Sequence, residues 1–322
     1  MRIRAAIAVF ALALTATGCG SSSAPPPSMS VAPVEVEPSG AQEVNRASAT
    51  EQVDCGDREA SLRPGAQPAP GAMPPGSTMA AIAERGRLVV GVDQNTFMVG
   101  YRDPATGQLE GFDIDIAREI ARSIFGDPDR VDLRVVDASQ RESALQSGQV
   151  DLVIRTYSIT CERKLKVDFS TAYYYANQRI LAVRGSGIDS AATLAGKRVC
   201  AVAGTTSLPA LLALESKPAV YGAPTWTDCL LMLQQGQVDA ISTDDVVLAG
   251  LARQDPNVEV VGPSLGLEPY GVGIRKGDDD LVRFVNGALE RIRADGTWER
   301  IYQTWLRDLG PSPGPPQARY ED

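Results

Sequence analysis

A dense group of charged and hydroxyl side chains follows a short apolar run near the middle of the chain. Within nine residues the sequence places Arg155, Thr156, Ser158, Thr160 and Arg163. The preceding residues 151–154 have the composition of a short buried strand, and in open α/β sheets ligands bind at the carboxyl ends of strands. Because an arginine guanidinium matches a carboxylate with two parallel hydrogen bonds, the pattern predicts a site for a small anionic ligand.

The stretch that leads into this group has a near copy farther along the chain. Residues 145–151 read LQSGQVD, and 88 positions later residues 233–239 read LQQGQVD. Arg155 comes soon after the first copy, and Asp244 comes soon after the second. Two similar lobes, one presenting cations and the other an anion, would hold a zwitterion from both sides. An amino acid is the simplest ligand of that kind.

The composition argues against several classes of function. The chain has 322 residues, a net charge of −9 and no histidine. Histidine is the commonest general base and metal ligand, so its absence argues against Ser-His-Asp hydrolysis and most zinc chemistry. The lysines and arginines form no clustered basic face, so nucleic acid is not an expected partner. We expect no metal and no cofactor, and the acidity by itself indicates only solubility.

The N-terminus has the pattern of an export signal. Arg2 and Arg4 form a short positive region, residues 3–16 are mostly apolar, and Cys19 follows. The apolar run is too short to span a membrane. Its end resembles a bacterial lipoprotein cleavage box, which implies a signal peptide over residues 1–18 and lipidation of Cys19. The protein would then be anchored at the extracytoplasmic face of the cell membrane. An ordinary secreted protein is the alternative.

The rest of the chain divides into a linker, two lobes and a tail. Residues 19–80 are rich in Pro, Ser and Gly, and we expect them to form a tether without a core of its own. Beyond it, strand-length apolar runs alternate with amphipathic helical segments, which is typical of an α/β fold with largely parallel sheets. We expect a first lobe over residues 81–182 and 270–308 and a second lobe over 183–269. The proline-rich residues 309–322 are expected to be unstructured.

Four cysteines remain once Cys19 is set aside. They are Cys55, Cys161, Cys200 and Cys229. An even number in an exported chain indicates disulfides, for which three connectivities are possible, and no two of these cysteines have the spacing of zinc ligands. Cys200 in a predicted strand and Cys229 in a predicted helix both fall in the second lobe, which favours Cys200–Cys229 together with Cys55–Cys161. Four buried free thiols are the alternative.

The order of short motifs along residues 80–306 resembles one known family. The motifs are LVVGVD, GFDIDI, LQSGQVDLVI, SITCERKLKVDFS, GKRVCAVAGTTS and GQVDAISTDD. In this order they resemble the polar amino-acid-binding proteins of ABC importers, the solute-binding protein family 3, and most of all the glutamine/glutamate-binding lipoproteins of actinobacteria. The resemblance implies a type II periplasmic-binding-protein fold. In that fold two α/β lobes, joined by two hinge strands, close over one amino acid.

The resemblance also implies roles for residues of the first lobe. Arg163 matches the arginine that clamps the ligand α-carboxylate, and a surface charge is its alternative reading. Ser158 matches a hydroxyl on the same loop, and Thr156 matches a backbone contact there. Asp93 matches the position that faces the ligand side chain.

In the second lobe the family uses a loop and a carboxylate. Thr205 and Thr206 match a loop at a helix N-terminus whose backbone N–H groups also hold the ligand α-carboxylate. Asp244 matches the carboxylate that takes the α-ammonium. Because Asp245 and a predicted helix follow it, a simple helix-capping role is the alternative.

Arg155 bears on which amino acid is bound. The family often has a small residue there, and an arginine is hard to bury without an anion. That anion could be a second carboxylate of the ligand, or it could be Asp168, and a surface position is a further alternative. Asp93 argues partly the other way, because a carboxylate near the ligand side chain favours an amide. We therefore expect glutamate or aspartate, with glutamine or asparagine as the alternative.

The expected function is that of a monomeric, non-catalytic binding protein. It would deliver its amino acid to an ABC permease or report it to a membrane receptor, and the sequence does not separate these two roles. Some exported relatives with this fold are dehydratases of cyclohexadienyl acids, so an enzyme is the alternative from another class. Its general acid would be Glu162 or Asp93, but an amine-binding Asp244 argues against such an enzyme.

Overall fold

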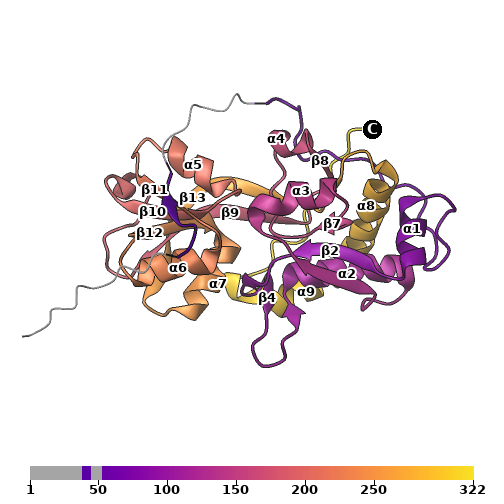
Figure 1. The fold of residues 1–322 in the computed structure, drawn as a ribbon, viewed down its shortest axis with the longest axis horizontal. Helices are drawn as coiled ribbons and strands as arrows, with labels where there is room; N and C mark the ends of the chain where they lie inside the picture. Colours follow the sequence, from indigo (N-terminus) through magenta and orange to yellow (C-terminus); the bar gives the residue numbers. More distant parts are fainter. Residues whose placement is uncertain (1–37, 45–52) are drawn as a thin grey trace, which may run out of the picture. The chain divides into compact units, whose positions relative to one another are not determined.

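The computed structural model describes residues 38–44 and 53–322 (Figure 1). The predicted signal peptide and the lipidation of Cys19 lie outside these residues. Within the described ranges, no helix is both long enough and apolar enough to cross a membrane. The described chain forms two α/β lobes, and two long strands connect them, as the resemblance implied.

The first lobe is built on a five-stranded sheet with the strand order β6-β2-β7-β14-β8. Its strands are β2 (Leu88–Val92), β6 (Val131–Val135), β7 (Leu152–Val153), β8 (Val167–Phe169) and β14 (Gly273–Arg275). A small second sheet consists of β3 (Asn95–Thr96), β4 (Gly100–Arg102) and β5 (Leu109–Glu110). The helices of this lobe are α1 (Thr78–Arg85), α2 (Phe112–Phe125), α3 (Arg141–Gln146), α4 (Cys161–Lys164), α8 (Asp279–Ala294) and α9 (Thr297–Trp305).

Helix α2 shows how the sequence determines the packing of this lobe. Ile116, Ile120 and Ile124 recur at helical spacing, and all three are buried in the core between the sheet and α8. The helix begins after Gly111, whose φ is 135°. A Cβ at this glycine would lie 2.2 Å from the carbonyl oxygen of Val99, so no other residue fits there.

The second lobe contains a six-stranded sheet with the order β1-β11-β10-β12-β9-β13. Its strands are β1 (Gln42–Glu43), β9 (Tyr174–Val183), β10 (Arg198–Val202), β11 (Ala219–Ala223), β12 (Ala240–Asp244) and β13 (Val258–Tyr270). Helices α5 (Ser207–Ala213), α6 (Trp226–Gln234) and α7 (Asp245–Gln254) pack on this sheet. A capping box between Thr225 and Asp228 starts α6, the helix that carries Cys229.

Strands β9 and β13 are the hinge strands. They pair antiparallel from Tyr174 opposite Tyr270 to Val183 opposite Val258, with a shift in register between Val261 and Gly266. The first lobe receives the chain again at β14, a short strand that is separate from β13. The break lies at residues 271–272, where a Cβ on Gly271 would contact the side chain of Ile159 at 2.8 Å.

The two segments predicted to lack structure differ most from expectation. Within 53–80 and 309–322, Ser61 and Tyr320 form a parallel bridge, and the Arg63 amide donates to the Asp322 carboxylate at 2.7 Å. The short β1 pairs with β11 at the edge of the second lobe. The two segments have too few apolar residues to build a core, but their backbone groups form hydrogen bonds with one another and with the lobes. Such pairing leaves no hydrophobic pattern in the sequence.

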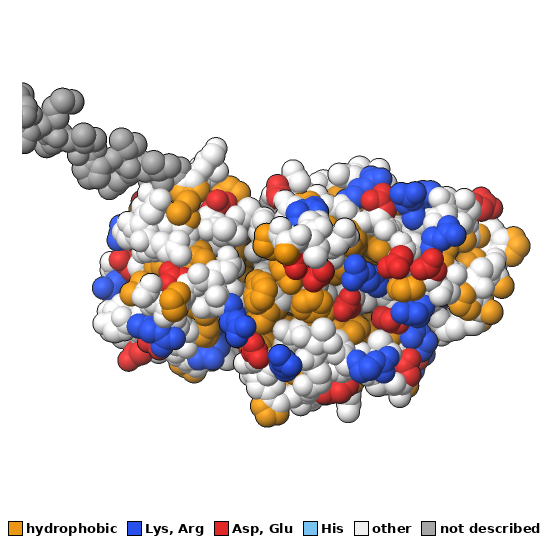
Figure 2. Space-filling view, turned by 90° about the horizontal axis from the view of Figure 1, so that it is seen from below, with side chains coloured by type: hydrophobic (Ala, Val, Ile, Leu, Met, Phe, Trp, Pro, Cys, Tyr) orange, Lys and Arg blue, Asp and Glu red, His pale blue; other side chains and the backbone are white. Residues whose placement is uncertain are grey.

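Charged side chains of both signs mix over the surface. On the face that Figure 2 shows, lysine and arginine side chains alternate with aspartate and glutamate side chains. That face therefore offers none of the continuous basic area that nucleic-acid binding requires.

Both disulfides that the sequence favours are present, Cys55–Cys161 and Cys200–Cys229. Cys200–Cys229 joins β10 to α6 across 29 residues of chain.

We expect replacement of both Cys200 and Cys229 by alanine to lower the free energy of unfolding by about 3–4 kcal/mol. Without the disulfide, the unfolded chain regains the conformational entropy that closing the loop had removed. Urea denaturation at pH 7 measures the difference, and peptide mapping without reduction should recover both linkages. A loss below about 1 kcal/mol would contradict this account.

Candidate functional site

A small polar cavity lies between the two lobes. It is lined by Arg141, Thr156, Ser158, Arg163, Thr205, Thr206, Ser207, Trp226, Thr243 and Asp244. Six of the eight residues predicted to bind ligand are among them. The other two, Asp93 and Arg155, are not.

Arg163 lies in α4, directly after the predicted strand and loop. Its backbone N–H donates to the hydroxyl of Thr160, the residue that caps this helix. This hydrogen bond fixes the backbone from which the Arg163 side chain extends. The guanidinium is buried and donates to the Ser158 carbonyl at 2.6 Å and to the Gly204 carbonyl, on the second lobe, at 3.1 Å. Burial lowers the pKa of this guanidinium. Arg163 thus reaches across the cavity instead of lying at the surface.

Arg141 is a second cation in the lining, and the sequence interpretation missed it. It starts α3 and is buried, and its guanidinium donates to the carbonyls of Ala138, Arg155 and Gly204 at 2.9, 3.2 and 2.9 Å. Burial, followed by the nearby charges of Arg163 and Arg155, lowers the pKa of Arg141. The position of Arg141 just past β6 was the available signal, because ligands bind beyond the carboxyl ends of strands.

The ring of Tyr157 supports both of these arginines. The Arg141 guanidinium carbon lies 4.3 Å from the ring centroid, and that of Arg163 lies 4.9 Å from it. Such cation–π contacts partly replace the water that burial removes. Among the described residues, no carboxylate lies within ion-pair distance of Arg141 or Arg163. Both charges are therefore held by carbonyl dipoles and an aromatic face alone.

Asp244 is the only carboxylate in the lining. It ends β12 and precedes α7, but its side chain makes no capping hydrogen bond; Asp245 accepts the hydrogen bond from the N–H of Val246 instead. One Asp244 oxygen accepts from the Tyr270 hydroxyl, and the other, Oδ1, is buried without a hydrogen-bond partner in the described chain. Burial, and next the charge of Glu268, raises the pKa of Asp244 to about 8. This oxygen can therefore accept a hydrogen bond from a bound ligand.

The loop that carries Thr205 and Thr206 closes the second side of the cavity. Gly204 has a φ of 77°, and a Cβ there would lie 2.6 Å from the Ser139 Cα of the first lobe. Only glycine allows the two lobes to approach so closely. The Thr206 hydroxyl donates at 3.0 Å to Glu268, a carboxylate on β13 that is outside the lining. The loop leads directly into α5, as the resemblance implied.

Arg155 has an anion of its own inside the protein. Its guanidinium pairs with Asp93 at 3.3 Å, and both side chains are buried. The alternative partner, Asp168, binds Lys276 at 2.7 Å instead. The sequence interpretation did not weigh Asp93 as the partner. Ligand contacts by Asp93 and Arg155 remain predictions, since neither residue lines the cavity.

A further carboxyl, that of Asp113, contacts the backbone of the site. Asp113 accepts from the backbone N–H of Thr156 and from the Tyr173 hydroxyl, each at 2.8 Å. Burial raises its pKa to about 7. Thr156 has a φ of 40°, which a threonine rarely adopts. The Asp113 contact holds the strained residue in place and turns it towards the cavity.

The site contains no feature of a metal centre. In the part of the chain that the structure describes, no three carboxylate or cysteine groups are arranged to hold a metal ion. The lining provides hydroxyl groups, two guanidinium groups and one carboxylate. These groups can bind a small charged molecule through hydrogen bonds and ion pairs.

Comparison with known proteins supports this kind of site. Residues 88–308 match the bacterial extracellular solute-binding proteins, family 3. The ABC transporter glutamine-binding protein GlnH of Bacillus subtilis is 36% identical over 232 residues, covering 72% of this chain and 85% of that protein. The glutamate-binding protein GluB of Corynebacterium efficiens is 32% identical over 242 residues, covering 70% of this chain and 81% of that protein.

Solved structures agree on the fold. An ancestral arginine-binding protein bound to arginine matches with a TM-score of 0.64 at 36% identity, covering 69% of this chain and 99% of that one. The solute receptor for L-cysteine of Neisseria gonorrhoeae matches with a TM-score of 0.69 at 29% identity, covering 72% of this chain and 95% of that one. These relatives are binding proteins and not enzymes, so the predicted fold and the non-catalytic class are confirmed. The chain belongs to the bacterial extracellular solute-binding proteins, family 3.

Proposed function

We propose that the protein binds one acidic amino acid, glutamate or aspartate, between its lobes on the extracytoplasmic side of the cell membrane. The cleavage box that ends at Cys19 supports a lipid anchor, which keeps the monomeric protein beside its membrane partner. The bound amino acid is handed to an ABC importer or reported to a membrane receptor. GluB, named as a glutamate-binding protein, is among the relatives.

The balance of charge in the cavity lining carries this proposal. The lining has two guanidinium groups, on Arg141 and Arg163, and one carboxylate, on Asp244. Glutamate and aspartate carry two carboxylates and one ammonium group at neutral pH, so they match the lining charge for charge once Asp244 is ionised, and a nearby ammonium group favours that form. A buried charge without an opposite partner is costly, and both arginines need an anion that the described protein does not provide.

Each ligand group has a matching protein group. The α-carboxylate binds Arg163 and the loop of Thr205 and Thr206. The α-ammonium donates to Asp244, whose Oδ1 is otherwise unpartnered. The second carboxylate of the ligand binds the Arg141 guanidinium through a charge-assisted contact. Arg141 takes over the role that the sequence interpretation gave to Arg155.

Glutamine is the second candidate, because GlnH is named as a glutamine-binding protein. An amide ligand needs an acceptor near its side chain, and Asp93 is the predicted one. The Asp93 oxygens already accept from the N–H of Gln94 at 2.8 Å and from the Thr96 hydroxyl, and they pair with Arg155. With these partners in place, Asp93 has little capacity left for an amide, which favours the acidic ligand.

Isothermal titration calorimetry with a panel of amino acids tests the proposal. We expect glutamate and aspartate to bind more tightly than glutamine and asparagine. Arg163→Ala should weaken the binding of every amino acid at least about thirtyfold, because a desolvated α-carboxylate loses its charge-assisted partner. If the unmodified protein binds neither acidic nor amide amino acids, the proposed function is wrong.

Arg141→Met tests which cation recognises the second carboxylate. Methionine keeps much of the length of arginine but none of its charge, so the affinity for glutamate should fall at least about tenfold more than that for glutamine. The matched control is Asp93→Asn combined with Arg155→Met, which removes the neighbouring ion pair as a unit and should keep the preference for glutamate. The opposite outcome would restore Arg155 as the residue that recognises the side chain.

Asp244→Asn should separate stability from binding. The pKa of Asp244 in the folded protein, about 8, exceeds the value of about 3.9 for an exposed aspartate, so protonation favours the folded state. This contribution to stability is complete below about pH 4 and is lost as the pH rises towards 8. Relative to the unmodified protein without amino acid, the variant should gain thermal stability, more at pH 8 than at pH 5.

Thermal unfolding at several pH values checks this, and calorimetry should find the affinity of the variant reduced at least about thirtyfold, because the α-ammonium loses its anion. A stability difference that does not change between pH 5 and pH 8 would contradict the raised pKa of Asp244.

A further inference from the structure

A segment outside the matched residues 88–308 contacts several of the elements on which ligand binding depends. We call residues 53–63 the N-terminal brace. The brace touches α4, which carries Arg163, and it touches both hinge strands. These contacts are distinct from the cavity and are not explained by the binding site itself.

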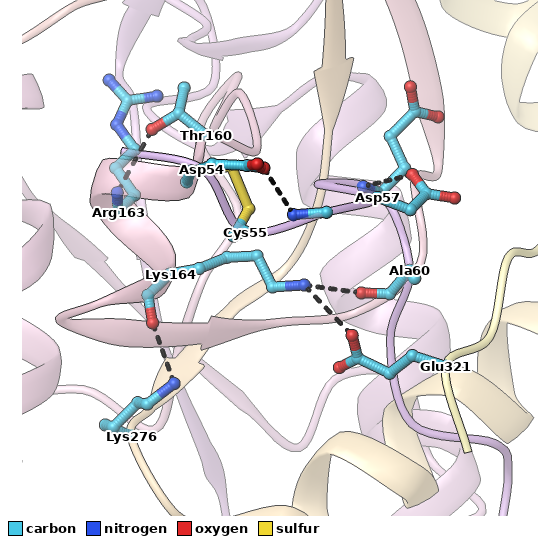
Figure 3. Close-up of a disulfide and its surroundings, with 12 residues drawn as sticks. Asp54, Cys55, Asp57, Ala60, Thr160, Arg163, Lys164, Lys276 and Glu321 are labelled. Atoms are coloured by element: carbon cyan, nitrogen blue, oxygen red, sulfur yellow. Dashed lines mark hydrogen bonds and ion pairs between the residues drawn. A yellow bond between two sulfur atoms is a disulfide. The ribbon is translucent and has the colours of Figure 1, made fainter. Parts of the chain in front are cut away.

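The first contacts fix the helix of the arginine clamp. Cys55 is bonded to Cys161, the first residue of α4. At the other end of this helix, the Lys164 ammonium donates to the Ala60 carbonyl at 2.8 Å and lies 3.8 Å from Glu321 (Figure 3). Arg163 lies between these two attachment points, on a helix of only four residues. A helix this short has little stability of its own, so its position depends on what holds its ends.

The second contacts reach the hinge. The Tyr175 hydroxyl on β9 donates to the buried carboxylate of Glu59, and the Arg58 guanidinium donates to the Leu267 carbonyl on β13 at 3.0 Å. Tyr175 on β9 pairs with Pro269 on β13, and Leu267 lies two residues before Pro269 on β13. The brace thus holds both hinge strands at the same level, next to the first lobe.

The brace is itself fixed to the first lobe. The Ser61 side chain is buried and donates to the Phe169 carbonyl of β8 at 2.7 Å. The Asn286 amide of α8 donates to the Ser61 hydroxyl at 2.9 Å, and the Ser61 backbone pairs with Arg319 and Glu321 of the C-terminal segment. The brace is therefore anchored to the first lobe, and from there it can hold α4 and the hinge strands in place.

We propose that the N-terminal brace is a positioning element, which holds the Arg163 helix in its binding geometry and stiffens the lobe 1 ends of both hinge strands. A clamp that is held in place before binding loses less conformational freedom when the ligand arrives, and affinity rises accordingly. A stiffer hinge slows the opening of the lobes and therefore the release of ligand. The proposal rests on the proposed function in taking an amino acid as the ligand.

The full-length chain with Cys55→Ser and Cys161→Ser tests the covalent attachment. We expect the affinity for glutamate to fall about fivefold, mainly through faster dissociation, because the clamp helix is no longer held. Calorimetry and stopped-flow fluorescence measure both quantities, at a temperature well below the unfolding midpoint of the variant. An unchanged dissociation rate would overturn the proposal.

A matched pair of tyrosine substitutions tests the hinge contact without touching the disulfide. Tyr175→Phe removes the hydroxyl that binds Glu59, whereas Tyr320→Phe removes a hydroxyl that binds Glu290 on α8, away from the hinge. Both lose one tyrosine–glutamate hydrogen bond. Only Tyr175→Phe should speed ligand release, by about threefold, while Tyr320→Phe should leave it unchanged. Equal effects of the two substitutions would overturn the hinge role.

Hydrogen exchange without any amino acid separates this proposal from the proposed function. In the cysteine variant, the amides of β9 and β13 near Tyr175 and Leu267 should exchange faster than in the unmodified chain. If the unmodified chain binds no amino acid, the proposed function fails and the exchange measurement decides on the brace. Unchanged exchange in both hinge strands would refute it.

Discussion

Two buried guanidinium groups of the first lobe donate to one carbonyl oxygen of the second lobe, that of Gly204. Burial lowers the pKa of both Arg141 and Arg163, because their charges lose contact with water. Removing a charge from water costs several kcal/mol, and carbonyl dipoles return only part of that free energy. The site is therefore electrostatically incomplete, and an anion between the two arginines completes it.

The opposite side of the cavity has the complementary defect. Asp244 is buried with one oxygen unpartnered in the described chain, and burial, followed by the charge of Glu268, raises its pKa. Arg163 donates to the Gly204 carbonyl, and no ion pair joins it to Asp244 in the described chain. The proposed amino acid would place an ammonium group beside Asp244 and a carboxylate beside Arg163. Strain at Thr156, with its positive φ, fits the same view, since strained residues persist where function requires them.

The sequence predicts the fold and most of the lining because both follow from local patterns. Asp244 ends the apolar strand β12, and Arg163 lies in the helix that follows the apolar strand β7, so each is near the carboxyl end of a strand, one in each lobe. The partner of Arg155 could not be found in this way. β2 and β7 pair in parallel with Gly91 opposite Val153, so the same register brings Asp93 beside Arg155. Strand register joins residues 62 positions apart, and composition does not encode it.

The terminal segments show the other limit of sequence interpretation. The whole of residues 19–80 is rich in proline, serine and glycine, and residues 53–63 within it are too few and too polar to build a core of their own. It does not follow that the segment lacks structure, because hydrogen bonds to an existing lobe need only donors and acceptors. Ser61 and Glu59 are buried by such contacts, and a disulfide adds one covalent attachment. A segment without a hydrophobic pattern can therefore become part of a lobe, and here it contacts α4 and both hinge strands.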